Sequence, residues 1–268
     1  MVDLSGRVSL VTGAASGLGA ASASRLGACG ASVLCVDIDG AGAEQIAASI
    51  RSSGARAVAF AADVSRPEDN DAMAAAAVEA FGALHLAHLN AGIQVVASVV
   101  ESSLEEWDTV LNVNLRGTFL GVRACSRRII DGGGGALVLT SSTSGLMGVP
   151  GGAAYSASKH GILGLMKCAA ADLAPHGIRV NAVCPGIIDT PILGPLHGQT
   201  DTLTQYFGVT TPTGRVGSPD EVAQVVSFLL GNDASYINAT ALPIDGGLFG
   251  VLTAVANGVD ALERASVG

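Results

Sequence analysis

A tyrosine and a lysine stand four residues apart in this chain, at Tyr155 and Lys159, and Ser142 lies thirteen positions before the tyrosine. On a helix, residues i and i+4 share one face, so we expect the ammonium beside the phenol. Two unit charges about 4 Å apart interact by about 4 kcal/mol at an effective dielectric of about 20, which equals about three pKa units. The spacing therefore predicts that the pKa of the Tyr155 phenol falls towards neutrality, which makes it a usable base.

A glycine-rich turn follows the first predicted strand. Residues 7–12 read as a buried strand and run into Gly13-Ala14-Ala15-Ser16-Gly17-Leu18-Gly19, which opens an alanine-rich helical stretch. Gly13 permits a tight turn, Gly17 permits a pyrophosphate to approach backbone amides, and Gly19 permits close helix–strand packing. A chain with 36 glycines in 268 residues produces such patterns by chance. The position directly after a strand is what makes this one a predicted dinucleotide site.

In combination, these motifs resemble the short-chain dehydrogenase/reductase family over about residues 5–250. Leu89 departs from the family pattern, since many members have a second asparagine there. The matching segments are Thr12-Gly13-x-x-x-Gly17-x-Gly19, Asp63-Val64, Asn90-Ala91-Gly92, the tetrad positions Asn114, Ser142, Tyr155 and Lys159, Pro185-Gly186 with Thr190, and Asp245-Gly246-Gly247. So many motifs in the family's order are far more specific than any one of them.

The resemblance implies a reaction and a role for each tetrad residue. Tyr155 is the general acid/base that takes the alcohol proton while hydride leaves for the nicotinamide, and Lys159 holds the ribose hydroxyls. Ser142 hydrogen-bonds the substrate oxygen, with Ser144 as a helper. Asn114 keeps a water chain between Lys159 and solvent, although a buried asparagine here could equally satisfy a helix kink.

The predicted cofactor is NAD. Asp37 ends the second predicted strand, 18 residues after Gly19, where a carboxylate accepts hydrogen bonds from the ribose diol and repels a 2′-phosphate. Ser16 and Ile38 stand where NADP-preferring members of the family tend to carry Arg or Lys. The resemblance gives as cofactor-binding residues Gly13, Ser16, Gly17, Leu18, Gly19, Asp37, Ile38, Asp63, Val64, Asn90, Ala91, Gly92, Tyr155, Lys159, Pro185, Gly186, Ile188 and Thr190.

Composition narrows the class of protein. A net charge of −9 argues against nucleic-acid or anionic-membrane partners, and no apolar run approaches the ~20 residues of a membrane span. The chain opens with no signal segment, and its five cysteines lack CxxC spacing, which predicts buried reduced thiols in a cytoplasmic protein. The five histidines show no metal-ligand spacing, so we predict no metal site.

The alternation of apolar strands with helical stretches predicts an α/β, Rossmann-type, doubly wound fold: a seven-stranded, mostly parallel sheet with helices on both faces. We expect one domain over 1–250, a substrate loop without regular structure at about 191–217, and a tail over 251–268. The predicted strands lie near 7–12, 32–37, 57–61, 85–89, 135–141, 178–183 and 240–244. The predicted helices lie near 17–28, 41–53, 67–81, 104–130, 153–174 and 219–230, with Pro67 and Pro219 in first turns and Ser218 as an N-cap.

The substrate is less clearly marked than the reaction. Around the pocket we place Gln94, Ser144, Val149 and Ile187, a neutral set that predicts a neutral secondary alcohol or ketone as substrate. One alternative is a 3-oxoacyl-carrier-protein reductase, with Arg127 and Arg128 as a docking site, but Asp37 argues against its NADPH. An alternative of another class is a non-catalytic NAD-sensing regulator, against which the complete tetrad argues. The resemblance further implies a homotetramer.

Overall fold

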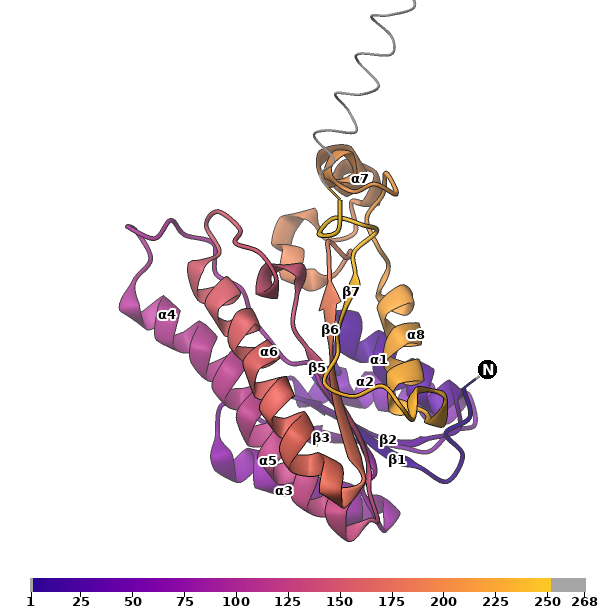
Figure 1. Cartoon of the computed structure of the whole chain (residues 1–268). Helices are drawn as coiled ribbons and strands as arrows, with labels where there is room; N and C mark the ends of the chain where they lie inside the picture. Colours follow the sequence, from indigo (N-terminus) through magenta and orange to yellow (C-terminus); the bar gives the residue numbers. More distant parts are fainter. Residues whose placement is uncertain (1, 252–268) are drawn as a thin grey trace, which may run out of the picture.

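The computed structural model describes residues 2–251, so the predicted tail from residue 252 onward lies outside the described residues. Its centre is a seven-stranded sheet in the order β3-β2-β1-β4-β5-β6-β7 (Figure 1). All six strand pairings of this sheet are parallel, which confirms the predicted fold class. The strands are β1 (Val8–Thr12), β2 (Ser32–Asp37), β3 (Ala57–Ala61), β4 (Leu86–Leu89), β5 (Gly135–Thr140), β6 (Ile178–Pro185) and β7 (Ala241–Ile244).

Helices cover both faces of the sheet because the strands are apolar on both sides. Neighbouring residues of β2 show this: Leu34 and Val36 pack into one hydrophobic core, Val33 and Cys35 into the other. Helices α3, α5 and α6 cover the first core, and α1, α2 and α8 cover the second (Figure 1). The helices are α1 (Gly17–Ala28), α2 (Gly40–Ser52), α3 (Pro67–Phe81), α4 (Leu104–Leu111), α5 (Gly117–Asp131), α6 (Ala153–Leu173), α7 (Thr200–Phe207) and α8 (Pro219–Leu230).

The single helix predicted over 104–130 is interrupted. A capping box between Ser103 and Glu106 begins α4, and a π-helical turn over Asn112–Arg116 separates α4 from α5. Asn114 lies in this turn and is fully buried. A π-turn places one extra residue in a helix and is frequent at functional sites. Helical periodicity alone does not reveal it, because the residues on either side remain helical.

The loop predicted without regular structure over 191–217 contains an eight-residue helix, α7, flanked by 3₁₀ turns at Pro191–Leu196 and Gly208–Thr210. Leu203 is fully buried and anchors α7 to the rest of the fold. The helix escaped prediction because the prolines around it indicate breaks. Figure 1 places α7 beyond the carboxyl ends of β6 and β7, where it covers one end of the sheet.

The predicted helix starts and thiols are mostly confirmed. Pro67 opens α3, and Ser218 caps α8 in a capping box with Glu221. All five cysteines are free thiols, but Cys168 is exposed on α6, so the prediction of five buried thiols was wrong at this position. Within residues 2–251, no helix is long and apolar enough to span a membrane.

Candidate active site

The glycine turn joins the carboxyl end of β1 to α1. Gly13 and Gly17 have φ values of +70° and +51°, a region that side chains with a Cβ rarely occupy. A Cβ on Gly19 would lie well under 3.0 Å from the Gly13 carbonyl oxygen, so only glycine allows α1 to approach β1 this closely. Because α1 begins at Gly17, its first amides face the crevice between β1 and β4, where strand order reverses. Such a helix start accepts a pyrophosphate, so the turn fits the dinucleotide that the sequence predicted.

Asp37, the residue predicted to meet the adenosine ribose, ends β2. Its carboxylate accepts hydrogen bonds from the amides of Ala15 (2.9 Å) and Asp39 (3.0 Å), which fixes it between the glycine turn and the start of α2. The Ile38 side chain is 74% exposed, as expected for a residue that lies against a bound ring rather than in the core. The arrangement presents the Asp37 carboxylate at the carboxyl end of the second strand.

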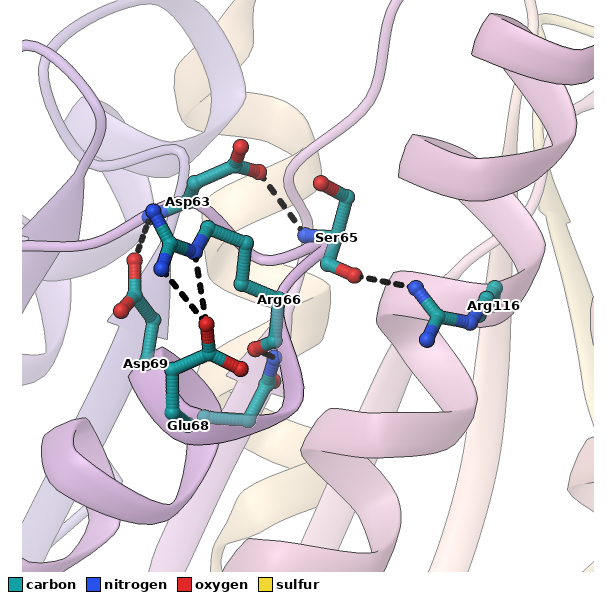
Figure 2. A network of polar contacts seen from close by, with 7 residues as sticks. Asp63, Ser65, Arg66, Glu68, Asp69 and Arg116 are labelled. Atoms are coloured by element: carbon teal, nitrogen blue, oxygen red, sulfur yellow. Dashed lines mark hydrogen bonds and ion pairs between the residues drawn. The ribbon is translucent and has the colours of Figure 1, made fainter.

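Figure 2 shows the loop that follows β3, which contains the predicted adenine contact Asp63-Val64. The Asp63 carboxylate accepts a hydrogen bond from the Ser65 amide, and the Asp63 amide donates to Asp69 (both 2.9 Å). Arg116, from the π-turn, donates to the Ser65 carbonyl. The loop that contains the predicted adenine contact is thereby joined to the helix segment that contains Asn114.

Thr12 ties the ends of β1 and β4 together. Its hydroxyl accepts hydrogen bonds from the amides of Asn90 (2.9 Å) and Ala91 (3.1 Å), and the Asn90 side chain donates to its carbonyl (3.1 Å). The side-chain nitrogen of Asn90 (Nδ2) also lies 2.9 Å from the position that a Cβ on Gly13 would occupy. Asn90 and Ala91 therefore pack directly against the glycine turn.

The four tetrad positions come together at the carboxyl ends of β4 and β5. Lys159 is buried and its Nζ donates to the Thr140 carbonyl (2.8 Å), while the same Nζ lies 5.4 Å from the centroid of the Tyr155 ring. Asn114 holds the backbone of Ile93 through both side-chain atoms (2.8 and 2.9 Å). A Cβ on Gly92 would lie 3.2 Å from Asn114 Oδ1 and 3.4 Å from Lys159 Nζ, so these two side chains flank one point.

Ser142 is the serine that contacts the tyrosine. It hydrogen-bonds the Tyr155 phenol, and its hydroxyl accepts a hydrogen bond from the Ser144 amide (3.1 Å). The latter bond caps a short 3₁₀ turn over Thr143–Gly145 and fixes the Ser142 side chain. The offset of thirteen residues had selected the same serine.

The predicted effect of Lys159 on Tyr155 was wrong in this structure. The pKa of the Tyr155 phenol is raised, because burial disfavours the phenolate, and the hydrogen bond with Ser142 only partly opposes this. Burial also lowers the pKa of Lys159 to about 8. The ammonium faces the Thr140 carbonyl, so the attraction expected for two groups about 4 Å apart does not develop.

The segment after β6 closes the crevice. A Cβ on Gly17 would lie 3.3 Å from the Thr190 side chain, which places Thr190 directly across the glycine turn. A Cβ on Gly186 would lie 2.8 Å from Asp245, so Pro185-Gly186 packs against the residue that follows β7. Ile188 is buried and its backbone pairs with Gly217 in an isolated bridge.

Asp189 is a residue that sequence reasoning missed. One of its oxygens accepts hydrogen bonds from His197 Nδ1 (3.0 Å) and the Gly198 amide (2.9 Å), and the other accepts one from the Thr200 hydroxyl (2.7 Å). Its partners lie in a stretch predicted to be irregular, so no sequence pattern linked them to it. These bonds tie residues 190–200, which we call the lid, back to Asp189, the residue just before them.

Three of the predicted substrate positions, Gln94, Ser144 and Val149, lie on two segments that run side by side, and Ile187 lies on a third segment, after β6. Gln94 is exposed and Val149 is 39% exposed, whereas Ser144 and Ile187 are half-buried. Ala97 pairs with Gly152 in an isolated bridge, which holds the segment after Gln94 against the segment that leads into Tyr155.

The family model described as "Enoyl-(Acyl carrier protein) reductase" matches residues 13–249 of this chain. Among curated proteins, the chain is 41% identical to cyclohexanol dehydrogenase from Acinetobacter sp. (strain SE19), over 90% of this chain and 94% of that protein. It is 38% identical to 3beta-hydroxysteroid dehydrogenase 1 from Eggerthella lenta, over 92% of this chain and 95% of that protein.

Among solved structures, the levodione reductase structure superposes with a TM-score of 0.85 at 36% identity, covering 92% of this chain and 99% of that one. A short-chain dehydrogenase/reductase from Mycobacterium marinum superposes with a TM-score of 0.88 at 32% identity, covering 93% and 98%. The chain therefore belongs to the short-chain dehydrogenase/reductase family. It is an oxidoreductase of the alcohol dehydrogenase/reductase class, acting on alcohols or ketones.

Proposed function

We propose that this chain is an NAD-dependent dehydrogenase that interconverts a neutral secondary alcohol, preferably cyclic, and its ketone. The observation that carries the proposal is the meeting of Ser142, Tyr155 and Lys159 beside a glycine turn shaped for a dinucleotide. Relatives named for cyclohexanol and for a hydroxysteroid favour a cyclic alcohol. The neutral residues at Gln94 and Val149 support an uncharged substrate.

Each tetrad residue has a proposed part in alcohol oxidation. The Ser142 hydroxyl holds the substrate oxygen against Tyr155, which takes the hydroxyl proton as the carbon gives up hydride. When bound, oxidised nicotinamide supplies the hydride acceptor and a positive charge beside the phenol. Lys159 holds the ribose and passes the proton onward, and Asn114 holds the backbone beside it.

The raised pKa of the Tyr155 phenol predicts how the rates of alcohol oxidation and ketone reduction depend on pH. Burial keeps this phenol protonated at neutral pH, which suits it as the acid in ketone reduction. Oxidation needs the phenolate, so activity in that direction is expected to rise with pH, whereas ketone reduction is expected to fall. Measuring kcat against pH in both directions tests this, and identical profiles would contradict it.

Tyr155→Phe tests the central role. We expect turnover to fall by at least about 100-fold, the scale of positioned acid–base catalysis, while the affinity for NAD changes little. Tyr206→Phe is the matched control, since that phenol is 67% exposed on α7 and should leave activity unchanged. Near-wild-type turnover by the Tyr155 variant would overturn the proposal. So would activity confined to NADPH and 3-oxoacyl thioesters, which would favour the reductase alternative.

The preference for NAD over NADP rests on Asp37, whose carboxylate is held in place by two amides. A 2′-phosphate beside this charge would be repelled. We expect kcat/KM to be higher with NAD than with NADP. Asp37→Ser should lower the ratio of the two kcat/KM values by about tenfold or more, which corresponds to a charge interaction of about 1.4 kcal/mol. A wild-type preference for NADP would refute the assignment.

We further propose a cytoplasmic homotetramer in which residues 1–250 act as one unit. The exposed faces of α5 and α6 support the assembly: Phe119 is 49% exposed, and α6 presents the small residues Gly164 and Cys168. The free thiols support a reducing compartment. Light scattering of the purified protein would test the assembly.

A further inference from the structure

His88 is a buried histidine with no part in the proposed reaction. It lies in β4, between β1 and β5, and its side chain is fully buried. Its Nε2 lies 2.8 Å from the Thr140 hydroxyl, whereas its Nδ1 has no hydrogen-bond partner in the described part of the chain. Burial lowers the pKa of His88 to about 3, so the ring is neutral. An unpaired polar atom at the centre of a sheet costs stability and therefore calls for an explanation.

The hydrogen bonds around His88 have only one consistent direction. A carbonyl oxygen can only accept, so the side-chain nitrogen of Asn90 must face the Thr12 carbonyl (3.1 Å). The Asn90 oxygen then faces the Thr140 hydroxyl (3.2 Å), which must donate its single proton there. The Thr140 oxygen is left to accept, so His88 must carry its proton on Nε2. The result is a directed chain from His88 through Thr140 and Asn90 to Thr12.

Both branches of this chain end on residues of the candidate active site. The carbonyl of Thr140 accepts the Lys159 ammonium, so the residue that contacts His88 also anchors the lysine. The Asn90 amide nitrogen lies 2.9 Å from the Cβ positions of both Gly13 and Gly19 and so packs directly against the glycine turn. The His88 imidazole is thereby connected through Thr140 both to Lys159 and, through Asn90, to the glycine turn.

We propose that His88 is a positioning residue, which through the Thr140 hydroxyl holds the Lys159 anchor and the Asn90 side chain in a single orientation. This role rests on the proposed function but adds to it a residue from the sheet interior. Without the imidazole donor, the Thr140 hydroxyl keeps only Asn90 as a hydrogen-bond partner among the described residues, so the hydroxyl and the Asn90 side chain bonded to it are held less firmly. We expect NAD binding and hydride transfer to depend on these groups, since they adjoin Lys159 and the glycine turn, whereas Gln94 and Val149 of the predicted alcohol pocket share no hydrogen bond with them within residues 2–251.

The test compares His88→Leu with His88→Gln. Leucine removes the donor, while the glutamine side-chain nitrogen reaches the position of Nε2 and can still donate to Thr140. We expect His88→Leu to lower kcat and to weaken NAD binding by about 2- to 10-fold each, the range of one net hydrogen bond, with the KM for alcohol unchanged. His88→Gln should restore both values, and calorimetry would measure NAD binding independently of turnover.

Ser9→Ala is the matched control. Ser9 lies on β1, beside β4, and its buried hydroxyl also has no partner among the described residues. It takes no part in the hydrogen bonds that connect His88 to Thr12. The variant should keep wild-type kinetics. Wild-type kcat and NAD affinity in His88→Leu would overturn the proposal, as would a His88→Gln variant as impaired as the leucine variant.

A second variant covers the case in which His88→Leu fails to fold. Thr140→Val removes the hydroxyl but keeps the carbonyl that holds Lys159, so it should show the same loss of NAD affinity, and adding His88→Gln should not deepen it. Wild-type NAD affinity in Thr140→Val would refute the role of His88. Because this readout is binding, it stands even if the proposed substrate proves wrong, whereas active Tyr155→Phe would refute the function alone.

Discussion

Replacing Gly19 with alanine should destroy the cofactor crevice, because the added methyl group has nowhere to go. Its Cβ would fall far inside 3.0 Å of the Gly13 carbonyl oxygen and 2.9 Å from the Asn90 amide nitrogen. Both neighbours are held, one as backbone and the other by its bond to Thr12. The turn would have to open by about 1 Å, and overpacking of this kind costs about 1–3 kcal/mol and occasionally more. For a chain of this size that lowers Tm by about 2–12 °C.

The loss of NAD affinity should exceed the loss of stability. If the opened turn forfeits two amide bonds to the pyrophosphate, at about 1.5–3 kcal/mol each, the Kd rises by at least about 100-fold. Calorimetric titration with NAD measures this directly, and thermal unfolding without cofactor measures the stability. Gly148→Ala is the matched control, since a Cβ there meets nothing within 4 Å. A Gly19→Ala variant that binds NAD as the wild type does would refute the argument from close packing.

Three further outcomes are expected. Asp189→Ala should raise the KM for alcohol by about 2- to 10-fold and make the lid more sensitive to proteolysis, because the lid loses its three hydrogen bonds to this carboxylate. Asp201→Ala removes an equal charge from α7 and should have neither effect. Equal effects of the two variants would argue against a lid held by Asp189. The pKa of His88 is about 3 in the folded protein and 6.5 in the unfolded chain, so the folded state is favoured when the imidazole is neutral. This contribution to the free energy of unfolding, about 4–5 kcal/mol, is present above pH 6.5 and is lost as the pH falls towards 3. Urea unfolding at a series of pH values should show this loss of stability in the wild type and not in His88→Gln. Gly164→Arg fits the monomer, since a Cβ there meets nothing within 4 Å, and should reduce the mass seen by light scattering if α6 packs between subunits; an unchanged tetramer would exclude that face.

Local patterns were enough to predict most of the architecture. Strand–glycine–helix order placed the cofactor turn, and apolar runs alternating with helical stretches placed the seven strands. The offset between Ser142 and Tyr155 selected the serine that the structure brings to the phenol. Each of these features is written in residues close together in the chain or at fixed spacing.

Features that depend on distant partners were not predictable. The chain from His88 joins β1, β4 and β5 through side chains that meet only after the sheet has formed. Asp189 finds its partners only because the lid turns back on itself. The sign of the Tyr155 pKa shift was also missed, since spacing indicates which charge is near but not how much water the fold removes.

The position of Asn114 in the candidate active site depends on the extra residue in the π-turn over Asn112–Arg116. One extra residue turns everything after it by about 100° relative to an unbroken helix. Deleting a residue there would let α4 and α5 merge into a continuous α-helix with more regular backbone bonding. The same deletion would withdraw Asn114 from Ile93 and Ser158 and carry Arg116 away from Ser65. A shorter chain would thus gain a more regular helix and lose the contacts by which Asn114 and Arg116 tie this helix to the candidate active site.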